Sequence, residues 1–559
     1  MKRFVKSFML ASLAVLLASC NCYNKMLKKV DRIDVSATPA VVTLKGNNAV
    51  TDIKVNFPAK YFNKRAVLKI TPVLVFEGGE IAGTPKFVQG EKVKDNYEVI
   101  SYKQGGSYTQ SVSIPYDKRA KISTLELRIE SKCSKNCGKK RKQFLPFAAI
   151  PVAEGVSTVQ LLADNAAYLT IMPDNFKRVT TITKDADIMY QINRSNVRPG
   201  ELTKEQVKMF EDFVKEYSNK DRATLGNVYA KGYASPDGPV KFNDELSKKR
   251  SESGQEAIAK KLSSVNPKYD IAAYGEDWEG FKELVSASDI EDKDLILQVL
   301  AMQDNPVKRD EEIKSMTAVF EVLAKEILPQ LRRTKLIADV DIEGRTDAEI
   351  KEAAAKNIDV LSEEEMLYAA TLTDDNAAKL KAYEAAASKY NSVRGYNNAG
   401  VILAKEGKLA QAKAQLDKAA AMSKDAAITN NLGVVALMNG DLATAQKYLS
   451  ALNTADSKAN MGLVNLAEGN YAEAAKTLSG YDLAVAEVLN GNLSKAKSIL
   501  AGENSADADY LRAVIATKEG DMKTAGAQLK AAVAKDSALV KKASKDVNLK
   551  PLFKSGFKF

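Results

Sequence analysis

Hydrophobic and polar residues alternate in short runs over the first third of the chain. The clearest runs are residues 41–44, 53–57, 66–70, 73–76, 111–114 and 124–129, and Gly, Asn, Asp or Pro residues stand between them. Alternation with a period of two is typical of strands that bury one face, and the intervening residues favour turns. This pattern predicts an antiparallel β-sandwich over residues 30–178.

The middle of the chain combines strand and helix patterns. Between Thr203 and Tyr217 the apolar residues Val207, Phe210 and Val214 fall on one side of a predicted helix, which Thr203 begins as an N-cap. A second helix is predicted over residues 246–262, and strands over 227–231 and 336–340. We therefore expect an α+β domain over residues 183–345, with a helical insertion at about 278–331.

Five copies of a Gly-[Lys/Asp/Asn]-[Leu/Tyr/Met]-x-x-Ala pattern occupy the last third, residues 360–545. A Leu stands nine residues after each Gly, and a Gly or Ala stands seven residues before it. Small residues allow paired helices to approach, and the central Gly permits a left-handed turn between them. The pattern resembles tetratricopeptide (TPR) repeats, so an all-α solenoid with a protein-binding surface is implied. Asn397 and Asn430 are candidate partner contacts there, with helix capping as the alternative. The glycines are Gly407, Gly440, Gly469, Gly491 and Gly520.

The N-terminus has the pattern of a secretory signal. Residues 1–19 contain a basic start, an apolar run too short to span a bilayer, and small residues before Cys20. Leu-Ala-Ser-Cys resembles the lipobox of bacterial lipoproteins, which implies acylation of Cys20 and an outer-membrane location facing the periplasm. An ordinary cleaved signal, with Cys20 as a plain thiol, is the alternative.

Residues 232–250 resemble the strand–turn–helix signature of OmpA/Pal peptidoglycan-binding domains. The matching elements are Gly-Tyr-Ala-Ser-Pro-Asp-Gly, an aromatic-Asn pair and Leu-Ser-Lys-Lys-Arg, and residues 187–194 resemble the first strand of that family. The resemblance implies that Arg250 meets a carboxylate of a peptidoglycan stem peptide, because a guanidinium pairs well with carboxylates. It also implies site roles for Asn243 and Asn193. Ser235 stands where the family has Asp, and Asp237 is the candidate replacement.

The composition of the chain excludes several kinds of catalytic and metal site. The chain has no His, which excludes His-based catalytic sites and most catalytic zinc or iron centres, and we expect no metal and no cofactor. Four Cys are present; Cys133 and Cys137 form a candidate disulfide of an exported protein, with half a metal site as the rival interpretation. The net charge of +11 resides mainly in the first domain, near residues 132–142. We interpret this as a solvated hairpin tip, with acidic glycans or lipid phosphates as alternative partners and no nucleic acid.

No catalytic motif emerges. Ser-x-x-Lys occurs at residues 494–497 and 555–558 without partner motifs, so we expect no enzyme. The sequence predicts a lipid-anchored scaffold that tethers the envelope to peptidoglycan and binds a protein on its repeats. The alternative is a surface adhesin or a subunit of a secretion or assembly machine, in which the OmpA-like domain is only a spacer.

Overall fold

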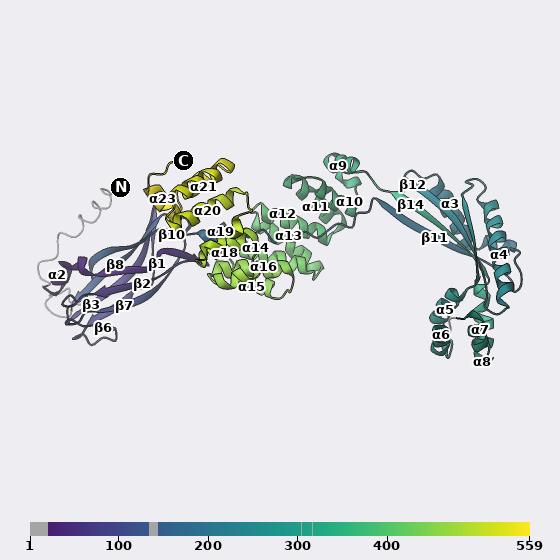
Figure 1. Ribbon diagram of the computed structural model, residues 1–559, viewed down its shortest axis with the longest axis horizontal. Helices are drawn as coiled ribbons and strands as arrows, with labels where there is room; N and C mark the ends of the chain where they lie inside the picture. Colours follow the sequence, from purple (N-terminus) through teal and green to yellow (C-terminus); the bar gives the residue numbers. More distant parts are fainter. Residues whose placement is uncertain (1–20, 134–142, 303–304, 316) are drawn as a thin grey trace. The chain divides into compact units, whose positions relative to one another are not determined.

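The computed structural model describes residues 21–133, 143–302, 305–315 and 317–559, so the signal segment and Cys20 lie outside it. The chain divides into two compact units. Unit 1 joins the N-terminal part up to Pro173 with Thr373–Phe559, and unit 2 is Asp174–Leu372. The protein is multidomain, with an N-terminal β-sheet region, a mixed α/β region and a C-terminal all-α TPR-like region (Figure 1). Among the described helices, none combines the length and hydropathy that a membrane span requires.

The β-sheet region consists of two sheets that share one core. Strands β10, β1, β2 and β7 form the first sheet, and β6, β5, β3, β8 and β9 the second, with β4 paired to β3. Val55 and Phe57 of the first sheet and Leu68 and Leu127 of the second belong to the same buried cluster. The strands are β1 (Asp34–Lys45), β2 (Asn48–Phe57), β3 (Ala66–Phe76), β4 (Gly79–Ala82), β5 (Lys86–Gly90), β6 (Glu98–Ile100), β7 (Gly106–Pro115), β8 (Ser123–Cys133), β9 (Leu145–Glu154) and β10 (Val156–Ser157).

Strand β3 merges two predicted runs, residues 66–70 and 73–76, across Pro72. On one edge, β5 pairs with β3 as far as Ile70, and β4 pairs with it from Val73 onward. Pro72 has no N–H to donate, and it stands where the partner strand changes from β5 to β4. The proline therefore marks a division of the neighbouring strand rather than the end of β3.

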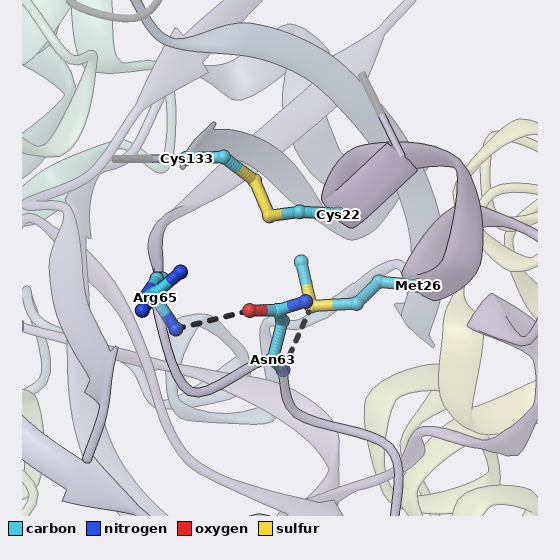
Figure 2. Close-up of a disulfide and its surroundings, with 5 residues drawn as sticks. All are labelled: Cys22, Met26, Asn63, Arg65 and Cys133. Atoms are coloured by element: carbon cyan, nitrogen blue, oxygen red, sulfur yellow. Dashed lines mark hydrogen bonds between the residues drawn. A yellow bond between two sulfur atoms is a disulfide. The ribbon is translucent and has the colours of Figure 1, made fainter. Parts of the chain in front are cut away.

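A short helix, α2 (Asn21–Leu27), closes one end of this core. Tyr23 and Met26 are buried in it, and Met26 Sδ accepts the N–H of Asn63 at 3.3 Å (Figure 2). Cys22 of α2 forms a disulfide with Cys133 at the end of β8. The predicted pairing of Cys133 with Cys137 is therefore wrong as regards Cys133, because the packing of α2 brings Cys22 to it first. Cys137 lies outside the described residues, as do the basic residues 135 and 139–142.

The C-terminal helices of unit 1 follow one another as antiparallel pairs (Figure 1). Each turn glycine of the repeat pattern has a positive φ, between 74° and 87°. The helices are α11 (Asn376–Tyr390), α12 (Val393–Lys405), α13 (Leu409–Met422), α14 (Ala426–Met438), α15 (Leu442–Ser450), α16 (Ala455–Glu468), α17 (Tyr471–Thr477), α18 (Gly480–Leu489), α19 (Leu493–Leu500), α20 (Ala506–Glu519), α21 (Met522–Lys535), α22 (Leu539–Ala543), η9 (Val547–Leu549) and α23 (Lys550–Lys554).

The predicted close approach of paired helices at small residues is confirmed at the glycine positions of the first three pairs, Gly400, Gly433 and Gly462. A Cβ added to Gly400 would lie 2.7 Å from Leu416 Cγ, and one added to Gly433 would lie 2.6 Å from Leu449 Cγ. Real side chains do not approach so closely, so these glycines set the distance between the paired helices. Alanine at these positions would push the helices apart.

The β-sheet region and the helical repeats contact each other within unit 1. In the turn between β1 and β2, the N–H of Gly46 donates to the carbonyl of Ala467 at 2.6 Å, and Asn47 Nδ2 donates to the carbonyl of Gly440 at 3.2 Å. Near the C-terminus of the chain, Ser157 Oγ of β10 donates to Asn548 Oδ1 of η9 at 3.2 Å. These contacts explain why the two regions cluster as one compact unit.

Unit 2 is built on a four-stranded sheet in the order β11–β14–β12–β13, with β12 and β13 parallel and the other pairs antiparallel. Helices α3 and α4 pack on this sheet around Phe210, Val228 and Ile258. Residues 360–372, which the repeat pattern had been expected to include, belong to this unit. The elements are β11 (Val179–Met189), η5 (Pro199–Thr203), α3 (Glu205–Ser218), β12 (Ala223–Ala234), α4 (Val240–Lys261), β13 (Tyr269–Glu276), β14 (Arg333–Glu343), α9 (Asp347–Lys356), η7 (Ile358–Val360), α10 (Glu363–Ala369) and η8 (Ala370–Leu372).

Helices between β13 and β14 occupy the predicted insertion. They enclose a separate apolar cluster that includes Phe281, Leu300 and Leu331, so the insertion has its own small core. These elements are α5 (Trp278–Ala287), α6 (Lys293–Met302), α7 (Pro306–Ser315), α8 (Thr317–Glu326) and η6 (Leu328–Leu331).

The disulfide gives a first prediction. Replacing Cys22 and Cys133 by Ser should lower the free energy of unfolding of the β-sheet region by about 2–5 kcal/mol, because the bond closes a long loop. Calorimetric unfolding of the full chain measures this loss, and Cys137→Ser is the matched control. Recovery of a Cys133–Cys137 peptide from a non-reducing digest would contradict the assignment.

Candidate functional site

An extended segment of the chain itself lies along the helical repeats. This linker segment, residues 163–173, follows η4 (Val159–Leu162) and precedes unit 2. It contacts buried polar side chains on α12, α14, α16 and α18, the first helices of successive pairs. We call this surface the asparagine groove. It is defined by Asn397, Asn398, Asn430, Asn431, Asn460 and Asp482.

Two asparagines bind the main chain of the linker segment with both polar atoms of the side-chain amide. Asn398 Oδ1 accepts the N–H of Met172, and its Nδ2 donates to the carbonyl of the same residue, each at 2.8 Å. Asn431 does the same for Thr170, again at 2.8 Å for each bond. Each side-chain amide thus pairs with a residue as a neighbouring β-strand would. This recognition requires no particular side chain on the bound segment.

Three further asparagines complete the groove. Asn397 Nδ2 donates to the carbonyl of Thr170 at 3.1 Å, and Asn430 and Asn460 both donate to the carbonyl of Tyr168, at 2.9 and 3.2 Å. They also bond one another: Asn431 Nδ2 donates to Asn397 Oδ1, and Asn460 Nδ2 donates to Asn430 Oδ1, each at 2.9 Å. Because all five amides are at most 2% exposed, breaking any contact leaves a buried polar group unpaired.

The segment advances two residues for each of the first three repeats and four residues to the next. Asn398, Asn431 and Asn460 bond residues 172, 170 and 168 in turn, so the segment runs opposite to the order of the repeats. In the next repeat, Asp482 Oδ1 accepts the N–H of Asp164 at 2.9 Å. Burial, with the nearby Asp164 carboxylate, raises the pKa of Asp482 to about 6, although the bond from the Asp164 N–H opposes the shift. The carboxylate is therefore costly to keep ionised at neutral pH.

Apolar side chains of the segment fill the spaces between these polar contacts. Leu169 is 9% exposed and belongs to the cluster of Val401, Ile428 and Leu432, with Met172 packed against it. The groove therefore combines main-chain recognition with an apolar pocket, which is how extended peptides are bound elsewhere.

Sequence reasoning identified part of this site. Asn397 and Asn430 were proposed as partner contacts, and the structure shows them bound to the chain's own linker segment. Asn398, Asn431, Asn460 and Asp482 were missed. Each stands nine residues before the turn glycine of its repeat, Gly407, Gly440, Gly469 and Gly491. This constant spacing from the glycine is a sequence signal that could have identified them.

A second polar cluster lies in unit 2, where β12 leads into α4. Ser235 Oγ donates to Asp237 Oδ1 at 2.5 Å, and Arg332 donates to Ser235 Oγ and Asp237 Oδ2, each at 3.1 Å. The turn thus joins two predicted residues with Arg332, which precedes β14. Asp237 and Arg332 side chains are 19% and 11% exposed, so both reach the surface of the described structure.

Arg250 has a different role from the one predicted. It is 1% exposed, and its guanidinium donates to the carbonyls of Arg194, Tyr233 and Gln191 at 3.0, 2.9 and 3.2 Å. Burial lowers its pKa to about 10, so it remains charged at neutral pH. Main-chain oxygens from the loop after β11 and from the end of β12 take the place of the expected ligand carboxylate. In this structure Arg250 clamps these two segments together.

The other predicted residues also support the turn. Asn243 is 3% exposed, and its Nδ2 donates to the carbonyls of Ser235 and Gly238 and to Glu276 Oε1. Asn193 is exposed, with a φ of 55°, in the loop whose carbonyls surround Arg250. A Cβ on Gly232 would lie 2.0 Å from the Ser247 carbonyl oxygen, so this glycine allows α4 to pack on β12.

Loss of one asparagine tests the groove. Asn431→Ala should lower the free energy of unfolding of unit 1 by about 2–4 kcal/mol, because the N–H of Thr170 and the buried Oδ1 of Asn397 lose their partner. It should also expose the linker segment to chymotrypsin at Tyr168 and Leu169, as read by limited proteolysis and mass spectrometry. Asn439→Ala, at an exposed position of the same repeat, is the control; equal proteolysis of the two variants would contradict the assignment.

Comparison with known proteins adds little to this geometry. No family model and no curated protein matches the chain. Among solved structures, one titled "Crystal structure of YrrB: a TPR protein with an unusual peptide-binding site" is similar at 20% identity and a TM-score of 0.19. The match covers 36% of this chain and 100% of the other.

Proposed function

We propose that the protein is a non-catalytic scaffold of the bacterial cell envelope that holds protein partners on its TPR-like repeats. The asparagine groove is the observation that carries this proposal. It binds a polypeptide through main-chain atoms along four successive repeats, which is the chemistry of a protein-binding surface. An acyl anchor at Cys20 would hold this scaffold at the membrane, and a mature chain without acyl groups would contradict that part.

The bound linker segment limits where a partner can sit. Because the segment is part of the same chain, its effective concentration at the groove is far above that of any separate peptide. A partner therefore uses the second helices of the pairs, which carry the exposed residues Lys413, Lys447 and Lys476. The linker segment holds the successive repeats together, and the second helices of these repeats form the surface for the partner.

Site-specific photo-crosslinking tests the scaffold. A photoreactive amino acid at Lys413, Lys447 or Lys476 should join the protein in intact cells to one and the same partner protein. Exposed positions of the β-sheet region, such as Lys92 and Lys103, are the controls. If adducts at the helical positions are absent, or match those of the controls, the scaffold proposal fails.

We propose peptidoglycan contact as a second function, favoured by the pair of Asp237 and Arg332. A carboxylate and a guanidinium 3.1 Å apart offer one partner for an amine and one for a carboxylate. The end of a peptidoglycan stem peptide carries both groups. Arg332 takes the role that the sequence had given to Arg250, and Ser235 holds the two charged groups in register.

Co-sedimentation with isolated sacculi tests this contact. Asp237→Asn and Arg332→Gln should each reduce the bound fraction about tenfold, the loss expected for one charge-assisted hydrogen bond. Lys248→Gln, at an exposed position of α4, is the matched control. Arg250→Ala is unsuitable, because it empties a buried site and destabilises unit 2. Sedimentation that is unchanged by both substitutions would remove the cluster from any wall contact.

A further inference from the structure

A cavity of about 580 Å³ lies within unit 1, where the β-sheet region meets the helical repeats. We call it the junction cavity. The turn between β1 and β2 lines one side, α14 and the start of α15 line another, and residues at and beside η4 line a third. Its volume is within the range of sites that bind small organic ligands, about 300–1,000 Å³.

Basic side chains are the charged groups that line the cavity. Lys118, Lys121 and Lys542 contribute to its wall, and no Asp or Glu is among its lining residues. Lys121 is half-buried, and among the described residues no carboxylate lies within ion-pair distance of it. Burial lowers its pKa, with Lys542 and Lys545 acting in the same direction and Asp546 opposing them.

The nearby carboxylates are already engaged. Asp546 accepts hydrogen bonds from Tyr510 and from Asn548, at 2.7 and 2.9 Å. Asp507 lies 3.8 Å from Lys542 at a largely exposed position. Lys542 has Asp507 as an ion-pair partner, so Lys121 is the half-buried ammonium of the cavity without one among the described residues.

The rest of the wall is apolar, with one unpaired amide. Leu44, Leu162 and Leu437 are each at most 9% exposed and form part of the lining, whereas Leu161, also in the lining, is 57% exposed. Gln160 is 6% exposed, and its Oε1 has no hydrogen-bond partner among the described residues. The unpaired Oε1 is an acceptor, so it can bond only to a group that donates a proton.

We propose that the junction cavity binds an anionic amphiphile, a single acyl chain with a small anionic headgroup. The headgroup meets Lys121 and Lys542. The chain lies against Leu44, Leu162 and Leu437, and Leu161 covers it. A free fatty acid and an anionic lysophospholipid both have this chemistry, and the site differs from the asparagine groove and from the Asp237 cluster.

Displacement of a fluorescent fatty acid tests the site. The full chain with Cys20→Ser, purified without detergent, is titrated with 11-(dansylamino)undecanoic acid, and saturable binding is expected. Laurate and a lysophosphatidylglycerol are then used as competitors, with dodecanol as the neutral control. Laurate alone competing identifies a fatty-acid site, both competing identifies a site for the shared chemistry, and dodecanol competing equally with laurate overturns the proposal.

Variants assign the binding to the cavity. Lys121→Gln with Lys542→Gln should raise the dissociation constant of the probe at least about tenfold, because charge-assisted contacts are lost. Lys54→Gln, at an exposed position of β2, should leave it unchanged. Leu161→Gln should weaken binding without lowering the melting temperature, since the side chain is exposed. No saturable binding, or equal affinity in the double variant and the Lys54 control, would refute the proposal.

Discussion

The pairing of buried asparagines with the main chain of residues 168–172 is the interaction on which the architecture of unit 1 depends. It joins two parts of the chain separated by more than 220 residues, and it adds to the direct contacts between the β-sheet region and the repeats within unit 1. Unit 2 is thereby an insertion, entered at Asp174 and left at Leu372. If the linker segment left the groove, both polar atoms of the Asn398 amide and the Oδ1 of Asn431 would lose the main-chain partners that they have in this structure, so the segment and the groove stabilise each other.

Buried polar side chains have different roles at the two polar sites. In the groove, asparagines of high burial bind a polypeptide, and their geometry is that of a strand partner. In unit 2, Arg250 is equally buried, yet its hydrogen bonds go to the carbonyls of adjacent segments. Arg332, which precedes β14, is the cation that stands beside Asp237 at the surface. Burial, more than residue type, separates the supporting residues from those that can meet a ligand.

Much of the local structure was predictable, because it depends on nearby residues. The alternating runs became strands, and the glycine phase correctly placed the helix turns and the contacts of Gly400 and Gly433 with leucines. Of the asparagine groove, Asn397 and Asn430 were predicted as partner contacts, but the occupant was not. Its identity depends on a contact between residues 172 and 398 that no local pattern encodes. The pairing of Cys22 with Cys133, and the burial of Arg250 by a loop at residues 191–194, likewise depend on tertiary packing.

The insertion of unit 2 has a consequence for synthesis on the ribosome. Met172 is made 226 residues before its partner Asn398, which is about 10–45 s at ordinary translation rates. During that interval the β-sheet region is complete, whereas its linker segment has nothing to pair with and unit 2 can fold first. The nascent chain must therefore keep residues 163–173 unassembled until α12, α14, α16 and α18 have been made, a delay that favours chaperone binding at this segment.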